Sequence, residues 1–292
     1  MGSDVRRSVS LYFTYTKPKV WSLLVFVGTV GAIIAIDNRS SADWFLVLLA
    51  VFSLSAGSAG SESVTNFIDR DIDSKMSRTR DRPLVTGSIS PQSGLILGFF
   101  LISLSILVLL AFGKYMAALF ISIGIADNVL VYSYLLKRRT PWSVILGGFS
   151  GGFPVLVGWY TITLSFSFLP WFLFALVVVW IPVHIWSLAY RYRDDYERAG
   201  VPMLPVVYSE KISAVCISFS AVLLVIFSII PYFLGENSAI YIIVVAFISV
   251  PLLLLAALFV KERDLKNSFN LFKYSSPFLT IIFLLFTILK FV

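Results

Sequence analysis

The sequence predicts an all-α polytopic membrane protein, arranged as a bundle of about nine transmembrane helices with a pseudo-repeated four-helix unit. Hydrophobic residues make up 58% of the 292 residues and charged residues only 13%, a composition too apolar for a soluble domain. The apolar residues are gathered in runs long enough to cross about 30 Å of hydrocarbon. Lys and Arg residues are gathered between alternate runs.

The apolar runs follow one another with short connections, so residues 1–292 are expected to form a single transmembrane domain. The fifth run is the most irregular, because several glycines and Pro154 interrupt it. The one cysteine, Cys216, lies inside an apolar run, which excludes a disulfide framework and a cysteine-based metal site. The expected spans are residues 20–36, 44–64, 94–112, 116–136, 144–162, 169–189, 212–234, 239–260 and 276–289.

The basic residues are distributed very unevenly between the two sides of the expected bundle. All but three of the 23 Lys and Arg residues lie before the first run or in the connections that follow the even-numbered runs. This asymmetry places the N-terminus and those connections in the cytoplasm, with the protein in the cell membrane. It also accounts for the net charge of +7 without a nucleic-acid partner.

Two of these cytoplasmic connections carry acidic clusters, the first acidic loop at residues 66–92 and the second at residues 190–209. In the first, Asn66, Asp69 and Asp73 have the i, i+3, i+7 spacing of one helix face. Carboxylate and amide oxygens suit Mg²⁺, which substrate phosphates usually complete, and nearby Arg and Lys residues suit those phosphates. Taken alone, a mixed-charge loop is more often a solvated connection.

A second acidic cluster makes a metal site the better interpretation of the first loop. It contains Asp194 and Asp195 at the end of the sixth run, four helices after the first cluster. Acidic clusters at corresponding helix ends indicate a duplicated four-helix unit with one site between its halves. Two Mg²⁺ ions clamping one diphosphate would stabilise it as the leaving group of an allylic diphosphate. An ion-coupled transporter is the alternative from another class, but its site is expected near the membrane midplane.

Several longer motifs carry a resemblance to a known family. The pattern N-x-x-D-x-x-x-D at residues 66–73 resembles the first signature of the UbiA-type intramembrane prenyltransferases. Residues 69–84 (D-R-D-I-D-x-x-M-x-R-T-x-x-R-P-L), 147–159, 180–186 (W-x-P-x-H-x-W) and 194–205 (D-D-Y-x-x-A-G-V-P-M-L-P) are similar to its haem-modifying branch, the protoheme IX farnesyltransferases or haem O synthases. The resemblance runs from about Thr16 to Pro205, and the last three helices match only in hydropathy.

The resemblance implies a prenyltransferase domain that catalyses a Mg²⁺-dependent transfer of farnesyl from farnesyl diphosphate to a vinyl group of haem B. Water addition then gives haem O and diphosphate. It implies one Mg²⁺ on Asn66, Asp69 and Asp73, while Asp194 and Asp195 bind or orient a second. The four aspartates are the implied catalytic residues, and the implied substrate contacts are Arg78, Arg82, Tyr134, Lys137, Trp180, His184 and Arg191.

The same resemblance implies a lipid-embedded enzyme whose product passes to a haem A synthase or a terminal oxidase. The wider superfamily often has D-x-x-x-D in the second cluster, whereas residue 198 is Arg198 here. This departure bears on the geometry of the second metal site.

Three further residues have open roles. His184, the only histidine, could ligate or orient haem iron, or pack between helices. Glu62 lies one turn before Asn66 and is expected to face the same cavity, whereas Asp127 is an acid within the fourth run. A quinone precursor or another aromatic acceptor remains the alternative to haem, against which His184 and the motif at residues 194–205 argue.

Overall fold

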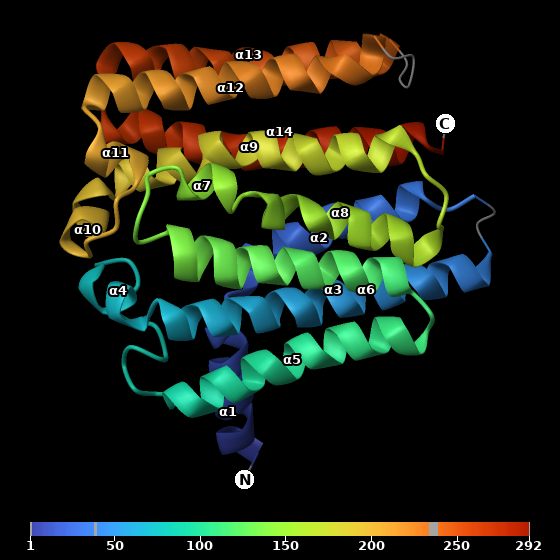
Figure 1. Ribbon diagram of the computed structural model, residues 1–292. Coiled ribbons are helices and arrows are strands. Elements are labelled where there is room, and N and C mark those ends of the chain that lie inside the picture. Colours follow the sequence, from blue (N-terminus) through green and yellow to red (C-terminus); the bar gives the residue numbers. More distant parts are fainter. Residues whose placement is uncertain (1, 38–39, 234–238, 292) are drawn as a thin grey trace.

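The structure is a computed structural model that describes residues 2–37, 40–233 and 239–291. Within these ranges all regular structure is helical, and most of the long helices lie side by side with roughly parallel axes (Figure 1). Eight helices are long and apolar enough to cross a membrane, and a ninth span results if α1 and α2, bent by 69°, count as one. The described ranges therefore confirm the all-helical membrane architecture.

The spans follow the expected order closely. They are α2 (Pro18–Ile34), α3 (Ser41–Ile68), α5 (Pro91–Ala111), α6 (Tyr115–Ala126) with the π-helix η1 (Asp127–Leu136), α7 (Ser143–Leu146) with α8 (Phe149–Ile162), α9 (Phe168–Arg191), α12 (Glu210–Phe233), α13 (Ala239–Glu262) and α14 (Leu265–Leu289). Before them comes α1 (Gly2–Tyr15). Residue 234, the expected end of the seventh span, lies outside the described residues.

The expected start of the last span at residue 276 is wrong, because α14 already begins at Leu265. Polar residues such as Asn267 and Lys273 interrupt the hydropathy of this stretch but do not stop the helix. Asp264 caps its first turn, since the Asp264 side chain accepts a hydrogen bond from the Asn267 backbone nitrogen at 2.6 Å. The extra turns contact α9, where Ser268 Oγ donates to the Ser187 oxygen at 2.6 Å.

The packing repeats in two units of four spans. In the first unit α2 packs on α3, α3 on α5 and α5 on α6, and in the second α8 packs on α9, α9 on α12 and α12 on α13. The first helices of both units cross at the centre, where a Cβ atom on Gly158 would lie 1.9 Å from the Gly28 carbonyl oxygen. Only glycine permits this approach, which brings the two units together.

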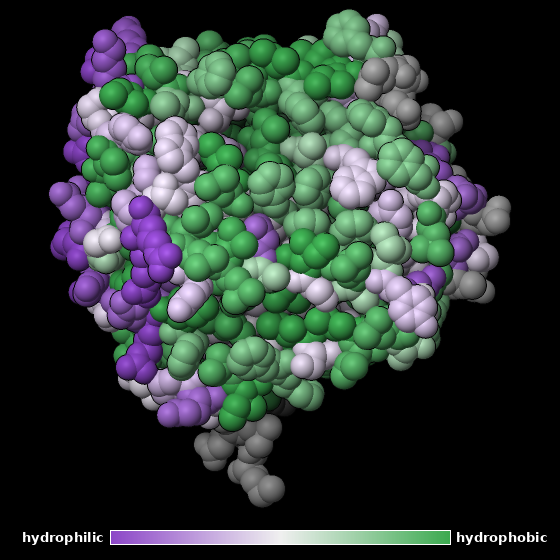
Figure 2. Space-filling model, in the orientation of Figure 1, coloured by the Kyte–Doolittle hydropathy of each residue, from purple (hydrophilic) through white to green (hydrophobic). Residues whose placement is uncertain are grey.

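The end of the bundle that carries α4 (Arg70–Lys75), α10 (Arg193–Arg198) and α11 (Leu204–Val207) is called the acidic end below (left in Figure 1). On the face seen in Figure 2, hydrophobic residues cover the middle and hydrophilic residues gather mainly at the two ends. Exposed large apolar side chains in such a band are those expected to contact lipid. The candidate site lies at the acidic end and continues inward.

Candidate active site

The first acidic loop continues the helical register of α3. The backbone nitrogen of Asp69 donates to the Thr65 oxygen at 2.9 Å, and that of Asp73 donates to the Asp69 oxygen at 2.8 Å. Asp69 is both the last cap of α3 and the first cap of α4, so the two helices join without losing the common face. Asn66, Asp69 and Asp73 are consequently buried together, with 3%, 3% and 4% of their surface exposed.

Both carboxylates of this face pair with cations. Lys137 Nζ lies 2.5 Å from Asp69 Oδ2, and Arg82 Nη1 lies 2.5 Å from Asp73 Oδ2. Burial by itself would lower the pKa of Lys137, but the Asp69 carboxylate, together with Tyr132 and Tyr196, outweighs burial and the pKa is raised. Lys137 is therefore a fixed positive charge beside the acidic face.

The amide of Asn66 has a defined orientation. Its Nδ2 donates to the Tyr15 carbonyl oxygen at 2.7 Å, an atom that can only accept. Its Oδ1 therefore lies on the other side of the amide, where Arg82 Nη1 is 3.5 Å away. Asn66 thus presents an oxygen, and not a nitrogen, to the face shared with the two aspartates.

This donor set fits Mg²⁺. In the part of the chain that the structure describes, no group of three or more His, Cys, Asp or Glu side chains is arranged to hold a metal. Two carboxylates and one amide oxygen nevertheless suit a hard cation that keeps waters and shares substrate phosphates. Asp69 Oδ1 is buried and has no hydrogen-bond partner within the described ranges, which leaves a charged oxygen available as a ligand.

The second acidic loop divides its two acids between different environments. Asp195 is buried, accepts a hydrogen bond from Ser77 Oγ at 2.6 Å and pairs with Arg198. Burial would raise the pKa of Asp195, but the Ser77 hydrogen bonds and the Arg198 charge lower it overall. Asp194 keeps 76% of its side chain exposed beside Arg193. The Ser77 contact joins the two acidic loops, whereas Asp194 points away from the junction.

Of the other expected substrate contacts, Arg78 and Arg191 both lie close to Tyr192. Their guanidinium carbons are 5.6 Å and 5.9 Å from the centre of its ring. Tyr134 is 62% exposed and is not among the residues that line a cavity, whereas Tyr132 is. The structure thus brings Arg78 to the site and leaves Tyr134 on the outer surface.

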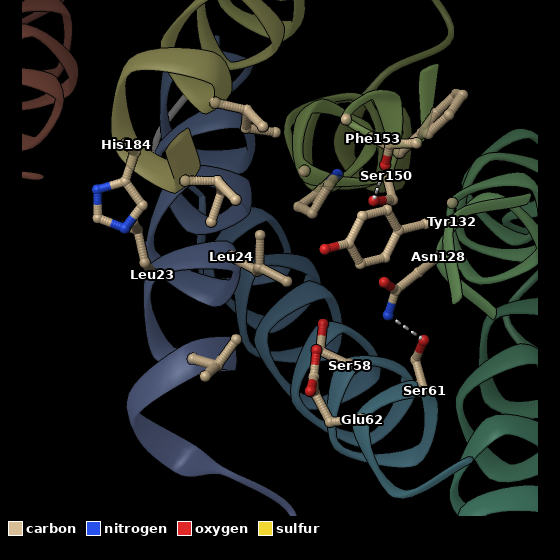
Figure 3. A pocket seen from close by; sticks show the side chains of 18 of the residues that line it. Leu23, Leu24, Ser58, Ser61, Glu62, Asn128, Tyr132, Ser150, Phe153 and His184 are labelled. Atoms are coloured by element: carbon tan, nitrogen blue, oxygen red, sulfur yellow. Dashed lines mark hydrogen bonds between the residues drawn. The ribbon is translucent and has the colours of Figure 1, made fainter. Parts of the chain in front are cut away.

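Two neighbouring cavities lie at and below the acidic end of the bundle. A smaller one of about 220 Å³ is lined by Asn66, Asp73, Arg78 and Arg82, among others. A larger one of about 640 Å³ runs between α2, α3, η1, α8, α9 and α14 (Figure 3). Arg78 lines both, so the two cavities are neighbours at this side chain.

The larger cavity has a polar wall, formed by Ser58, Ser61, Glu62, Asn128 and Tyr132, which face one region of it in Figure 3. The Asn128 amide donates to Ser61 Oγ at 2.9 Å. Asn128 and Tyr132 belong to η1, whose i→i+5 bonding continues as the Lys137 nitrogen donates to the Tyr132 oxygen at 2.8 Å. Such π-helical turns are frequent at functional sites, and they are not visible in hydropathy.

His184 lines the same cavity and lies between two aromatic rings. Its ring centre is 4.2 Å from Trp180 and 4.4 Å from Phe272. Ser275 Oγ lies 2.8 Å from the Phe272 oxygen and 2.8 Å from His184 Nδ1, and Ser276 Oγ lies 3.5 Å from the same nitrogen. Nδ1 thus has hydroxyl neighbours, whereas Nε2 has no hydrogen-bond partner in the described residues.

The remaining two acids have identifiable partners. Asp127 Oδ2 accepts from the Ser150 backbone nitrogen at 2.7 Å, in the first turn of α8. A carboxylate in this place stabilises a helix N-terminus, so Asp127 has a structural task. Glu62 Oε2 lies 2.9 Å from Lys17 Nζ, and the same side chain lines the larger cavity.

Comparisons with known proteins show the family of the chain. The model of the UbiA prenyltransferase family matches residues 24–284. A protoheme IX farnesyltransferase from Thermoplasma volcanium is 60% identical over 97% of this chain and 98% of its own length. The one from Thermoplasma acidophilum is 59% identical over 96% of this chain and 98% of its own length.

Solved structures share the fold. A structure described for a digeranylgeranylglyceryl phosphate synthase superposes with a TM-score of 0.78 at 21% identity, covering 97% of this chain and 99% of the other. A UbiA homologue from Archaeoglobus fulgidus, bound to DMAPP and Mg²⁺, gives a TM-score of 0.75 at 18% identity, covering 96% and 97%. At this identity the likeness concerns the fold alone.

Proposed function

The chain belongs to the UbiA prenyltransferase family and is a transferase, and from this we propose that it transfers farnesyl from farnesyl diphosphate to a vinyl group of haem B. Water then adds to the product cation to give haem O, and diphosphate is released. Because the chain is a transferase, the ion-coupled transporter alternative no longer applies. The haem acceptor is supported by the names of relatives that are similar over nearly the full length.

The observation that carries the proposal is the junction at Arg78, which lines both the small charged cavity and the large apolar one. A prenyl diphosphate has a charged head and a long apolar tail, so it needs these two environments in direct contact. The large cavity, at about 640 Å³, is within the range of small-molecule sites, which is about 300–1,000 Å³.

The head group would be held by the acidic face and its cations. Mg²⁺ bound by Asn66, Asp69 and Asp73 would neutralise charge on the diphosphate as the carbon–oxygen bond breaks. Arg78, Arg82 and Lys137 supply charge-assisted hydrogen bonds to phosphate oxygens. Asp195 holds the loop that carries Ser77 and Arg78, through its contact with Ser77. The buried Asp195 carboxylate also pairs with Arg198, which supports a role in orienting this loop.

The acceptor would lie deeper, beside His184. With Nδ1 donating to Ser275 Oγ, the lone pair of Nε2 would be free to ligate haem iron. Trp180 and Phe272 hold the imidazole plane from both sides. A quinone precursor offers no iron, so this arrangement favours haem among aromatic acceptors.

The decisive assay supplies membranes containing the protein with haem B and farnesyl diphosphate and measures haem O by chromatography and mass analysis. We expect farnesylated, hydroxylated haem from the wild type. If a quinone precursor is prenylated and haem B is left unchanged, the acceptor is an aromatic compound other than haem.

A variant of His184 separates the acceptor from the donor. His184→Ala is expected to weaken haem binding, seen as a lost or shifted Soret band of the purified protein, while binding of farnesyl diphosphate persists. Phe272→Leu keeps the imidazole but changes one ring beside it, and serves as the packing control. An unshifted Soret band with full haem O output in His184→Ala would assign His184 to packing alone.

The orientation in the cell membrane is also part of the proposal, with the acidic end facing the cytoplasm. It is supported by the Lys and Arg residues gathered in the connections at that end. A reporter fused after Asp264 is expected to be cytoplasmic, and one fused after Val292 external. Two reporters on the same side would contradict this arrangement. A haem A synthase or a terminal oxidase would then use the product.

A further inference from the structure

We propose that Glu62 accepts the proton of the water that adds to the haem vinyl cation, and that the polar wall holds this water in place. The inference rests on the proposed function, since it concerns the second half of that reaction. It assigns a catalytic task to Glu62, a carboxylate outside the metal and diphosphate groups.

Three polar groups of the wall lack protein partners. Ser58 Oγ, Tyr132 Oη and Glu62 Oε1 make no hydrogen bond to another described residue, although all three side chains line the larger cavity and point into it in Figure 3. Polar groups in this situation are normally served by ordered water. On the opposite side of the cavity in Figure 3, Leu23 and Leu24 lie with His184, whereas the three unpartnered groups all lie on the polar wall.

The position of Glu62 matches the place where a cation would form. It lies four residues before Asn66 on α3, about 6 Å away along the helix axis. It is thus one turn inward from the face that would hold the diphosphate, on the wall of the cavity that would receive the acceptor. Lys17 Nζ at 2.9 Å stabilises the ionised carboxylate, and an anionic side chain facing the cavity also favours a nearby carbocation.

The step balances without any further reactant than water. The terminal vinyl carbon forms a bond to C1 of the farnesyl group, and the diphosphate leaves with the electron pair of the C1–oxygen bond. The positive charge then lies on the vinyl carbon next to the pyrrole. The water oxygen bonds to that carbon, and the resulting oxonium ion gives one proton to Glu62, which later releases it to solvent.

The ion pair does not prevent this transfer. The adduct of water and a carbocation is a far stronger acid than a carboxylic acid, so even a carboxylate paired with Lys17 accepts its proton. Without the base and its water, the cation can instead lose a proton from the neighbouring carbon, which yields an alkene. Glu62 would therefore decide between a hydroxylated and a dehydrated product.

The test compares Glu62→Gln with the wild type in membranes supplied with haem B and farnesyl diphosphate. Products are separated by chromatography before mass analysis, and released diphosphate is measured in the same samples. The expected result is a fall of about tenfold or more in the ratio of hydroxylated to dehydrated farnesyl haem, with diphosphate release within about threefold of wild type. In labelled water, the wild-type hydroxyl group should carry the isotopic oxygen.

Lys17→Arg is the matched control, because it alters the same ion pair but keeps both charges. It is expected to change total turnover while leaving the product ratio close to that of the wild type. Ser58→Ala should move the ratio in the same direction as Glu62→Gln, but less.

Three outcomes would overturn the assignment of Glu62. One is a wild-type product ratio in Glu62→Gln, and another is the same altered ratio in Lys17→Arg, which would make the ion pair structural. The third is a parallel loss of diphosphate release and of both products in Glu62→Gln, which would place Glu62 in the diphosphate site. A wild type that farnesylates no haem would instead contradict the proposed function itself, so the two failures are distinguishable.

Discussion

The two acidic loops contain similar residues, but their carboxylates are neutralised in different ways. In the first loop, Asp69 pairs with Lys137, 68 residues later, and Asp73 pairs with Arg82, nine residues later. In the second loop, Asp195 pairs with Arg198 from the same short helix, and Asp194 stays in solvent. Distant pairs form only when the bundle is folded, whereas a pair three residues apart needs only a helical turn.

This difference indicates which loop the fold builds as a site. A buried charge costs several kcal/mol unless other groups compensate it, so two buried carboxylates on one face require a fixed arrangement of cations. The first loop has such an arrangement, together with an unpartnered oxygen on Asp69. The second loop contributes one buried acid that contacts the first loop through Ser77. We therefore propose that loops of similar composition differ in role, the first in binding and the second in positioning.

The largest effect is expected in the first loop. Asp69→Asn and Asp73→Asn should each lower farnesyl transfer by about 10²–10³-fold, because each removes a charged ligand that would act on the leaving group. The protein should remain in the membrane at normal amounts, since both substitutions keep the side-chain volume. Chelation by EDTA should inhibit the wild type, and Mg²⁺ should restore it. Unchanged transfer in both variants would remove this face from the site.

The second loop is expected to show an unequal pair. Asp195→Asn should lower transfer by about 10- to 100-fold, as for an outer residue that orients a binding group, whereas Asp194→Asn should change it by less than about twofold. Measuring both variants in the same membrane assay tests the division of roles between the loops. Equal large losses would contradict it and would support a second Mg²⁺ bound by the adjacent carboxylates.

The parts of the site that lie on one helix face could be predicted from the sequence. Asn66, Asp69 and Asp73 share a face because their spacing alone determines it, provided that the helix continues past Ile68. The order of the spans was equally accessible, because hydropathy reports the contact of each helix with lipid. Both predictions depend on information within a single segment.

Contacts between segments were harder to predict. Tyr132 lines the cavity and Tyr134 does not, because the π-helical register of η1 turns a different face inward. Phe272 and Ser275 hold His184, but they lie in the part of α14 that hydropathy failed to include. Lys17 reaches Glu62 across 45 residues. These partners follow from packing, and no pattern in their own segments indicates them.

The smallest effect is expected at Asp71, an acid of the first loop that is not on the buried face. Its carboxylate accepts two hydrogen bonds from Arg138, at 2.7 and 2.6 Å, but 59% of its side chain is exposed. Water and salt screen such a pair, so it contributes about 0–1 kcal/mol. Asp71→Asn should therefore shift the thermal unfolding of the purified protein only slightly, and the shift should shrink further in 1 M salt, where screening acts over about 3 Å.

Transfer activity of Asp71→Asn should stay within about twofold of wild type, because a screened surface pair adds little to the geometry of the site. A comparison of Asp71→Asn with Asp69→Asn tests whether a carboxylate is essential because it is buried or only because of its position in the loop. Asp71 and Asp69 are two residues apart and each pairs with one cation from the same connection, Arg138 or Lys137. A loss in Asp71→Asn as large as that in Asp69→Asn would mean that Arg138 positions Lys137, and that the first loop acts as one charged unit.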